Sequence, residues 1–161
     1  MITTDANIKV NVNGTVISNS KSQKLLGIKI DKKLSFDDHV DTICQKVSKK
    51  IHALARISSY MSSEKLRTVM KAFITSQFSY CPLVWMMHSR NINNRINRLH
   101  ERALRIVYKD YNSPFQKLLD LDKSVTIHER NIQLLATEMF KVVNDLSPDL
   151  IQERTALQLK K

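Results

Sequence analysis

The sequence predicts an α+β protein that is mainly α, with a small N-terminal three-stranded β element followed by a bundle of about four helices. Long segments that place apolar residues at steps of three and four predict the helices. Alternating β-branched residues around Asn13-Gly14 predict the strands. With 161 residues, 42% hydrophobic and 25% charged, the chain is expected to bury one core, and its three prolines and 6% aromatic residues argue against a β-sandwich or barrel.

The N-terminal part of the sequence has strand character. Residues 8–18 alternate around Asn13-Gly14, the dipeptide that best tolerates the positive φ angles of a type I′ turn, so we expect a β-hairpin there. A third run with strand character covers residues 24–31, and Gly27 inside it predicts a bulge or the close approach of another backbone. We therefore assign residues 1–34 to the small β element.

Two amphipathic helices are expected next. The first runs from an N-cap at Ser35 to about Tyr60, with the pair Asp37-Asp38 in the first turn, where carboxylates meet the positive end of the helix dipole. The second begins after Ser62 and ends before Pro82, because the residue that precedes a proline is pushed out of helical geometry. Each helix has one apolar stripe, which we expect to face the core.

A third helix from about Asn91 to Lys109, a short helical stretch over 115–121 and a last helix complete the predicted bundle. The last helix, which Pro148 closes, carries apolar residues at helical spacing: Ile132, Leu135, Ala136, Met139, Phe140 and Val143. All three prolines fall between the proposed helices, which supports these boundaries. We therefore expect a helical bundle over 35–148 and a polar tail over 149–161.

Positive charge gathers in the middle of the chain, whose formal net charge is +11. Residues 45–109 hold thirteen Lys and Arg against two Glu, whereas the remainder holds thirteen basic and thirteen acidic residues. A segment with so few acidic counterparts favours a polyanionic partner, and nucleic acid is the first candidate. The alternative is a solvated face on which Lys and Arg serve solubility.

The predicted third helix carries cations along one side. Five basic residues recur in it at steps of three and four: Arg95, Arg98, Arg102, Arg105 and Lys109. Like charges at this spacing repel one another, and guanidinium groups suit bidentate contacts with phosphate, so this row is the first candidate for a nucleic-acid-binding surface. Alternatively, the arginine stems pack against other helices while their heads stay in water. A second candidate set lies on the predicted first helix: Lys46, Lys49, Lys50 and Arg56.

The sequence shows no pattern typical of a catalytic or metal site. Its five histidines are scattered over different elements, and Cys44 and Cys81 stand without a paired C-x-x-C or H-x-x-x-H spacing. Cys81 is expected to be a buried small hydrophobe, and Tyr80 and Trp85 to pack in the core. Because two cysteines are too few for a disulfide framework and no apolar run approaches about 18 residues, we expect an intracellular protein, nuclear or cytoplasmic, that is neither secreted nor membrane-spanning.

Several short motifs follow one another along the chain. The run from Lys24 to Asp31 is followed by Leu34-Ser35-Phe36 and His39-Val40, and further on come Tyr80-Cys81-Pro82-Leu83 with Trp85, and Leu99 through Arg102-Ala103-Leu104-Arg105-Ile106. Over residues 8–150 this series resembles the segment after the palm in reverse transcriptases of non-LTR retrotransposons, the jockey-like group of LINE-type elements. The sequence departs from that family at Leu25, Phe36, Met86 and His100, where an aromatic residue, tryptophan, glycine and glutamine are usual.

The resemblance implies the end of the palm and the thumb of an RNA-directed DNA polymerase. Such polymerases hold Mg²⁺ with palm aspartates, because two-metal phosphoryl transfer needs clustered carboxylates. This sequence lacks the aromatic-x-Asp-Asp turn, since Phe36-Asp37-Asp38 has no intervening residue and sits at a helix start. We therefore expect no enzyme activity, no catalytic residue, no metal and no cofactor in this chain.

A thumb acts as a clamp, so the resemblance implies binding of an RNA or DNA duplex by its backbone, with little sequence preference. The remainder of a polymerase palm is a further expected partner, whereas a membrane or a small-molecule substrate is not expected. The alternative function is a helical interaction module that binds a partner chain or itself. A sequence-reading helix-turn-helix is less favoured, because the connection over 82–91 exceeds the usual three or four residues.

Overall fold

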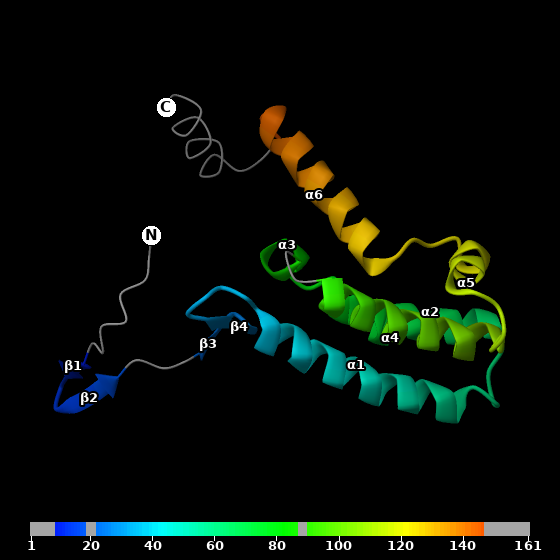
Figure 1. The fold of residues 1–161 in the computed structure, drawn as a ribbon, viewed down its shortest axis with the longest axis horizontal. Helices are drawn as coiled ribbons and strands as arrows, with labels where there is room; N and C mark the ends of the chain where they lie inside the picture. The colour runs from blue at the N-terminus through cyan, green and yellow to red at the C-terminus, as the bar shows by residue number, and fades with distance from the viewer. Residues whose placement is uncertain (1–8, 19–21, 87–89, 147–161) are drawn as a thin grey trace.

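The computed structural model describes residues 9–18, 22–86 and 90–146. Its fold is α+β and mainly α, which confirms the predicted class (Figure 1). The strands are β1 Lys9–Val12, β2 Thr15–Ser18, β3 Ser22–Leu25 and β4 Ile28–Asp31. The helices are α1 Asp37–Ile57, α2 Ser63–Phe73, the 3₁₀ helix η1 Thr75–Phe78, α3 Pro82–Trp85, α4 Arg90–Tyr108, α5 Phe115–Asp122 and α6 Ile127–Val143. Within these ranges, no helix combines the length and the apolar character that crossing a membrane requires.

The strands form two separate antiparallel hairpins, so the prediction of a three-stranded element is wrong. The hairpin at Asn13-Gly14 is confirmed, with Val12 opposite Thr15. The run over 24–31, however, folds back on itself and pairs Leu25 with Ile28. Leu26 and Gly27 both have positive φ angles, of 47° and 88°, as a two-residue turn of the I′ type requires. Gly27 therefore forms a turn and not a bulge.

The start of α1 also differs from the prediction, because Phe36 and not Ser35 occupies the N-cap position. The Asp31 carboxylate accepts hydrogen bonds from the backbone N–H groups of Lys33, Ser35 and Phe36, at 2.9, 3.2 and 2.8 Å. These bonds fold the chain into a tight turn that places Phe36 in the left-handed region, with φ 58°. The Asp37-Asp38 pair lies in the first turn of α1, as expected.

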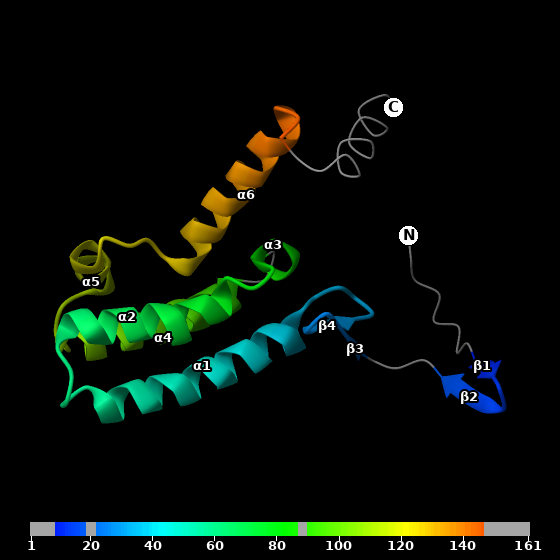
Figure 2. The ribbon, with the colours of Figure 1, turned by 180° about the vertical axis from the view of Figure 1, so that it is seen from behind.

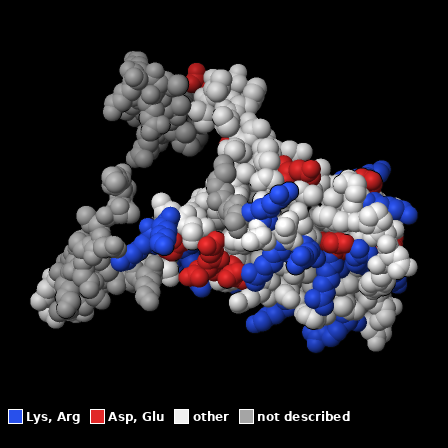
Figure 3. All heavy atoms as spheres, viewed as in Figure 1, with Lys and Arg blue, Asp and Glu red and all other residues white. Residues whose placement is uncertain are grey.

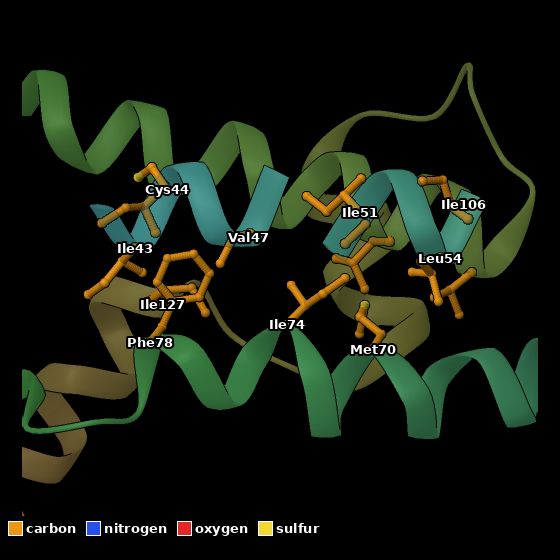
Figure 4. Packing of buried hydrophobic residues seen from close by; sticks show 14 of the residues in the cluster. Ile43, Cys44, Val47, Ile51, Leu54, Met70, Ile74, Phe78, Ile106 and Ile127 are labelled. Atoms are coloured by element: carbon orange, nitrogen blue, oxygen red, sulfur yellow. The ribbon is translucent and has the colours of Figure 1, made fainter. Parts of the chain in front are cut away.

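Three helices, α1, α2 and α4, enclose the main core. In Figures 1 and 2, α4 runs in the same direction as α1, and α2 runs in the opposite direction. Figure 4 shows side chains of α1 meeting those of α2, α4 and α6, and the most deeply buried of the set include Val47, Ile51, Met70, Ile74, Phe78 and Ile127. The apolar stripes of α1 and α2 extend beyond the core at their C-terminal ends, since the last residues of these helices, Ile57 and Phe73, are exposed.

Helix α6 contributes little to this core. Only Ile127 and Asn131 are buried along it, and Figures 1 and 2 show the helix leading away from α1, α2 and α4. Most of its apolar side chains are exposed, among them Ile132, Leu134, Met139, Phe140 and Val143. A capping box between Thr126 and Glu129 fixes its first turn. The predicted Pro148 boundary and the polar tail over 149–161 lie outside the described residues.

Candidate nucleic-acid interface

Helix α4 has a buried face and a cationic face. The buried face of α4 includes Ile96, Ala103 and Val107, which belong to the core. Arg98 and Arg102 lie on the other side of the helix and are exposed. They are one turn apart, and within the described ranges no carboxylate forms an ion pair with either. The helix therefore turns two adjacent guanidinium groups toward solvent.

Two members of the predicted row are held by carboxylates. Arg95 forms an ion pair with Asp41 of α1, and Arg105 pairs with Glu101 one turn before it, with 2.6 Å between Nη2 and Oε1. Arg105 also donates to the Asp110 carbonyl at 3.4 Å. Their charges are therefore partly compensated within the fold, in contrast to those of Arg98 and Arg102.

Lys109 does not continue the helical row, because α4 ends at Tyr108 and Lys109 has a positive φ angle of 55°. In this conformation the residue terminates the helix, and the N–H of Asp110 bonds back to the Arg105 carbonyl at 3.2 Å. The prediction that the third helix extends to Lys109 is thus one residue too long. The lysine side chain is exposed at the C-terminal end of the same helix.

The second predicted set lies on α1, which packs beside α4. Lys46, Lys49 and Arg56 are exposed. Lys50 is half-buried, and its Nζ lies 6.0 Å from the centroid of the Phe73 ring, at the outer limit of a cation–π contact. Figure 3 shows Lys and Arg side chains gathered over α4 and α1. We use the name cationic face for six exposed basic residues, five of them on these two helices and one just after α4: Lys46, Lys49, Arg56, Arg98, Arg102 and Lys109.

Three motifs of the family resemblance, those that contain Leu26, His39 and Tyr80, contact one another in space. The Tyr80 hydroxyl donates to the Leu26 carbonyl at 2.5 Å, and the backbone N–H of Lys29 donates to Nδ1 of His39 at 3.3 Å. The rings of His39 and Trp85 meet edge-on with centroids 6.3 Å apart. Trp85 is 1% exposed and donates from Nε1 to the Tyr80 carbonyl at 2.9 Å. These residues join the β3–β4 hairpin to the helices.

Trp85 is in the core as expected, whereas Tyr80 is exposed. Cys81 is exposed and not buried, because it occupies a left-handed N-cap position, with φ 45°, before Pro82. Cys44 is buried, and that burial raises the pKa of its thiol. Among the residues with a described placement, no three His, Cys, Asp or Glu side chains group closely enough to hold a metal ion.

A polar cluster that no sequence pattern indicates lies on the inner side of α4. Arg67 of α2 donates from Nε to the Asp122 carboxylate at 2.6 Å and from Nη2 to the Asp122 carbonyl at 2.5 Å. The Tyr108 hydroxyl donates to the same carboxylate at 2.9 Å. Burial alone would raise the pKa of Asp122, but hydrogen bonds, first that of Arg67, outweigh burial and lower it. Residues 67 and 122 lie 55 positions apart, and no local sequence signal links them.

Comparison with known proteins gives no match, since no family model matches the sequence and neither a curated protein nor a solved structure is similar to the chain. The chain is a mainly helical α+β protein in which two adjacent parallel helices, α1 and α4, present a cationic face.

Proposed function

We propose that this chain binds the sugar-phosphate backbone of an RNA or DNA duplex through the cationic face. The observation that carries the proposal is that Arg98 and Arg102 are exposed on one side of α4, with no ion-pair partner in the described part of the chain. Like charges one turn apart destabilise a helix by a few tenths of a kcal/mol. An anion that spans both guanidinium groups removes that repulsion.

The dimensions of α4 suit a duplex strand. Arg98 and Arg102 are four residues apart, which corresponds to about 6 Å along the helix axis, or the axial length of about two nucleotides of one strand. Lys109 extends the same edge, and Lys49 and Arg56 add cations from α1. Contacts to phosphates alone carry no sequence information, so the proposed binding is independent of sequence.

The family resemblance supports a more specific role. The motifs from Lys24 to Ile106 resemble the end of the palm and the thumb of a non-LTR retrotransposon reverse transcriptase, in which this chain would hold template and primer without catalysis of its own. The remainder of such a palm is then a partner, and Mg²⁺ belongs to that missing part. In this proposal the contacts of Tyr80, Trp85 and His39 have a structural role, because they fix the hairpin to the helices.

The proposal is tested by fluorescence anisotropy with short duplexes. Two RNA–DNA hybrids of unrelated sequence are expected to bind with equal affinity at the same salt concentration. Changing Arg98, Arg102 and Lys109 to Gln should weaken binding at least about tenfold, because three phosphate contacts are lost. A matched control changes three exposed lysines outside α1 and α4, Lys33, Lys65 and Lys117, to Gln, and should bind like the unchanged protein.

A second candidate function is self-association or binding of a partner chain through α6. The observation that favours it is the exposure of apolar residues over the C-terminal half of this helix and just after it, led by Val143, Leu146, Phe140 and Met139. Sedimentation at increasing protein concentration tests it. Association that Phe140→Ser and Val143→Ser abolish, together with an absence of duplex binding, would favour this function over backbone binding.

A further inference from the structure

A cavity of about 570 Å³ lies on the side of α4 opposite the cationic face. Its lining comes from α2 and η1, from α4, and from the connection between α5 and α6 with the first turns of α6, and it includes Lys71, Thr75, Ser79, His100, Lys123 and Arg130. His100 is two residues after Arg98, which corresponds to a rotation of about 200° around the helix. A ligand in this cavity is therefore separate from a duplex on the cationic face.

The cavity contains an arginine that the fold does not neutralise. Arg130 is half-buried and donates from Nη2 to the Ser79 hydroxyl at 3.0 Å and to the Thr75 carbonyl at 3.4 Å. No carboxylate in the described ranges forms an ion pair with it. Burial lowers the pKa of Arg130, but a guanidinium starts from so high a value that it remains a cation at neutral pH.

Asp122, which also lines the cavity, does not supply the missing counter-charge. Its carboxylate already accepts bonds from Arg67 and Tyr108 and is 1% exposed. Lys71 and Lys123 add two ammonium groups at the cavity wall. With the Asp122 charge compensated by Arg67, the remaining cavity has an excess of positive charge.

Three buried polar atoms of the cavity lining have no hydrogen-bond partner within the described part of the chain. These are Oγ1 of Thr75, Nδ1 of His100 and Oγ of Ser124. His100 is 3% exposed, and burial lowers its pKa to about 4, so the ring is neutral at pH 7 and offers a hydrogen bond and not a charge. Buried polar groups of folded proteins nearly always have partners, so three unpaired atoms in one cavity indicate a missing ligand or water.

We propose that this cavity binds a phosphomonoester group. A guanidinium, two ammonium groups, hydroxyls and an imidazole suit a tetrahedral oxyanion, whose oxygens accept hydrogen bonds from several directions. The volume exceeds that of a phosphate alone and leaves room for an attached sugar. The phosphate belongs either to a free small molecule or to the 5′ end of a nucleic-acid strand. This site goes beyond the backbone binding proposed above, and no small-molecule ligand is expected from the sequence.

The test is isothermal titration calorimetry on the full chain with inorganic phosphate, ribose 5-phosphate and ribose. Both phosphates should bind saturably and ribose should not. Arg130→Gln should weaken phosphate binding at least about tenfold, because it removes a charge-assisted hydrogen bond. Because Arg130 also bonds Ser79 and Thr75, the exposed Lys71→Gln is a second variant that leaves the fold undisturbed, with an expected weakening of about threefold. Lys117→Gln, which removes an exposed charge elsewhere, is the matched control and should bind like the unchanged protein.

Nitrogen chemical shifts of the His100 ring give an independent readout, since phosphate should move the Nδ1 signal. In competition with inorganic phosphate, displacement by a 5′-phosphorylated single strand, but not by its unphosphorylated form, would assign the phosphate to a strand end. Displacement by ribose 5-phosphate but by neither strand would assign it to a small molecule. The absence of saturable phosphate binding, or equal binding by the Arg130 and Lys117 variants, would overturn the proposal. Changing Arg98, Arg102 and Lys109 should leave phosphate binding unaltered, so the two proposals fail separately.

Discussion

Arginines on the two sides of α4 have opposite surroundings. On the inner side, Arg67 is bound by the Asp122 carboxylate and carbonyl, and Arg130 by a hydroxyl and a carbonyl. On the outer side, Arg98 and Arg102 are exposed, and no ion pair holds them within the described ranges. Arg67 therefore stabilises the fold, whereas Arg98 and Arg102 remain available to a ligand, as Arg130 does in the proposed phosphate site.

This difference shows that the net charge of +11 alone does not identify which cations are available to a ligand. Arg67 is part of the basic segment over 45–109, yet its charge is used inside the protein. Arg95 and Arg105 are intermediate, because Asp41 and Glu101 compensate them at the surface. The two sides should consequently respond to different variables, the inner side to pH and the outer side to salt.

The largest expected effect is on the inner side. Arg67→Gln leaves the Asp122 carboxylate, 1% exposed, without its cation. Removing one partner of a buried pair costs about 3–5 kcal/mol, and because Arg67 is 37% exposed, solvent screening reduces the expected loss to about 2–3 kcal/mol. Urea unfolding followed by circular dichroism measures it. A loss below about 0.5 kcal/mol would remove the distinction between the two sides.

The next effect is a dependence of stability on pH that originates at His100. Its pKa is about 4 in the folded protein and about 6.5 in the unfolded chain. Between these values the unfolded chain binds more protons, so stability falls as the pH falls from 6.5 toward 4, by about 2 kcal/mol between pH 7 and pH 5. His39, whose pKa burial also lowers, adds to the same trend.

Two comparisons isolate the His100 contribution. His100→Gln should flatten the dependence between pH 7 and pH 5, and the remaining slope belongs to His39. Asp122 does not interfere in this range, because its folded pKa lies below the usual value and its contribution is lost only at lower pH. An unchanged slope in the His100 variant would show that the ring is not buried in its neutral form.

The smallest expected effect on stability is on the outer side. Arg98→Gln and Arg102→Gln remove exposed side chains that no described carboxylate pairs with, so each should change the free energy of unfolding by less than about 0.5 kcal/mol. The relief of like-charge repulsion along α4 favours a slight gain over a loss. Destabilisation by more than about 1 kcal/mol in urea unfolding would mean that these arginines have a structural role.

Much of the fold could be predicted from the sequence because it follows from local chemistry. The Asn13-Gly14 turn and the apolar stripe of α1 each depend on a few neighbouring residues. The second predicted helix, expected to end before Pro82, is shorter, since α2 ends at Phe73 and the 3₁₀ helix η1 follows it. The second hairpin was missed because Leu26, which has a side chain that disfavours positive φ, occupies the position where Asn is usual. A hydrogen bond from Tyr80, 54 residues away, supports that turn.

The candidate surface could be predicted only in part. Helical periodicity placed Arg98 and Arg102 on one side of α4, but which cations have carboxylate partners depends on tertiary contacts such as that between Arg95 and Asp41. The inner cluster could not be predicted, because it joins α2, α4 and α5 through residues that are distant in the sequence. The exposed apolar side of α6 has the same periodicity as a buried one, so the sequence pattern does not reveal its exposure.

The salt dependence of hybrid binding tests the central claim most directly. If three to five phosphates are neutralised, the logarithm of the binding constant should fall against the logarithm of salt concentration with a slope of about −2 to −4.5. Changing Arg98, Arg102 and Lys109 to Gln should reduce the steepness by about 2 to 2.7, whereas the Lys33, Lys65 and Lys117 control should keep the original slope. An unaltered slope in the first variant, or equal flattening in both, would contradict backbone binding by the cationic face.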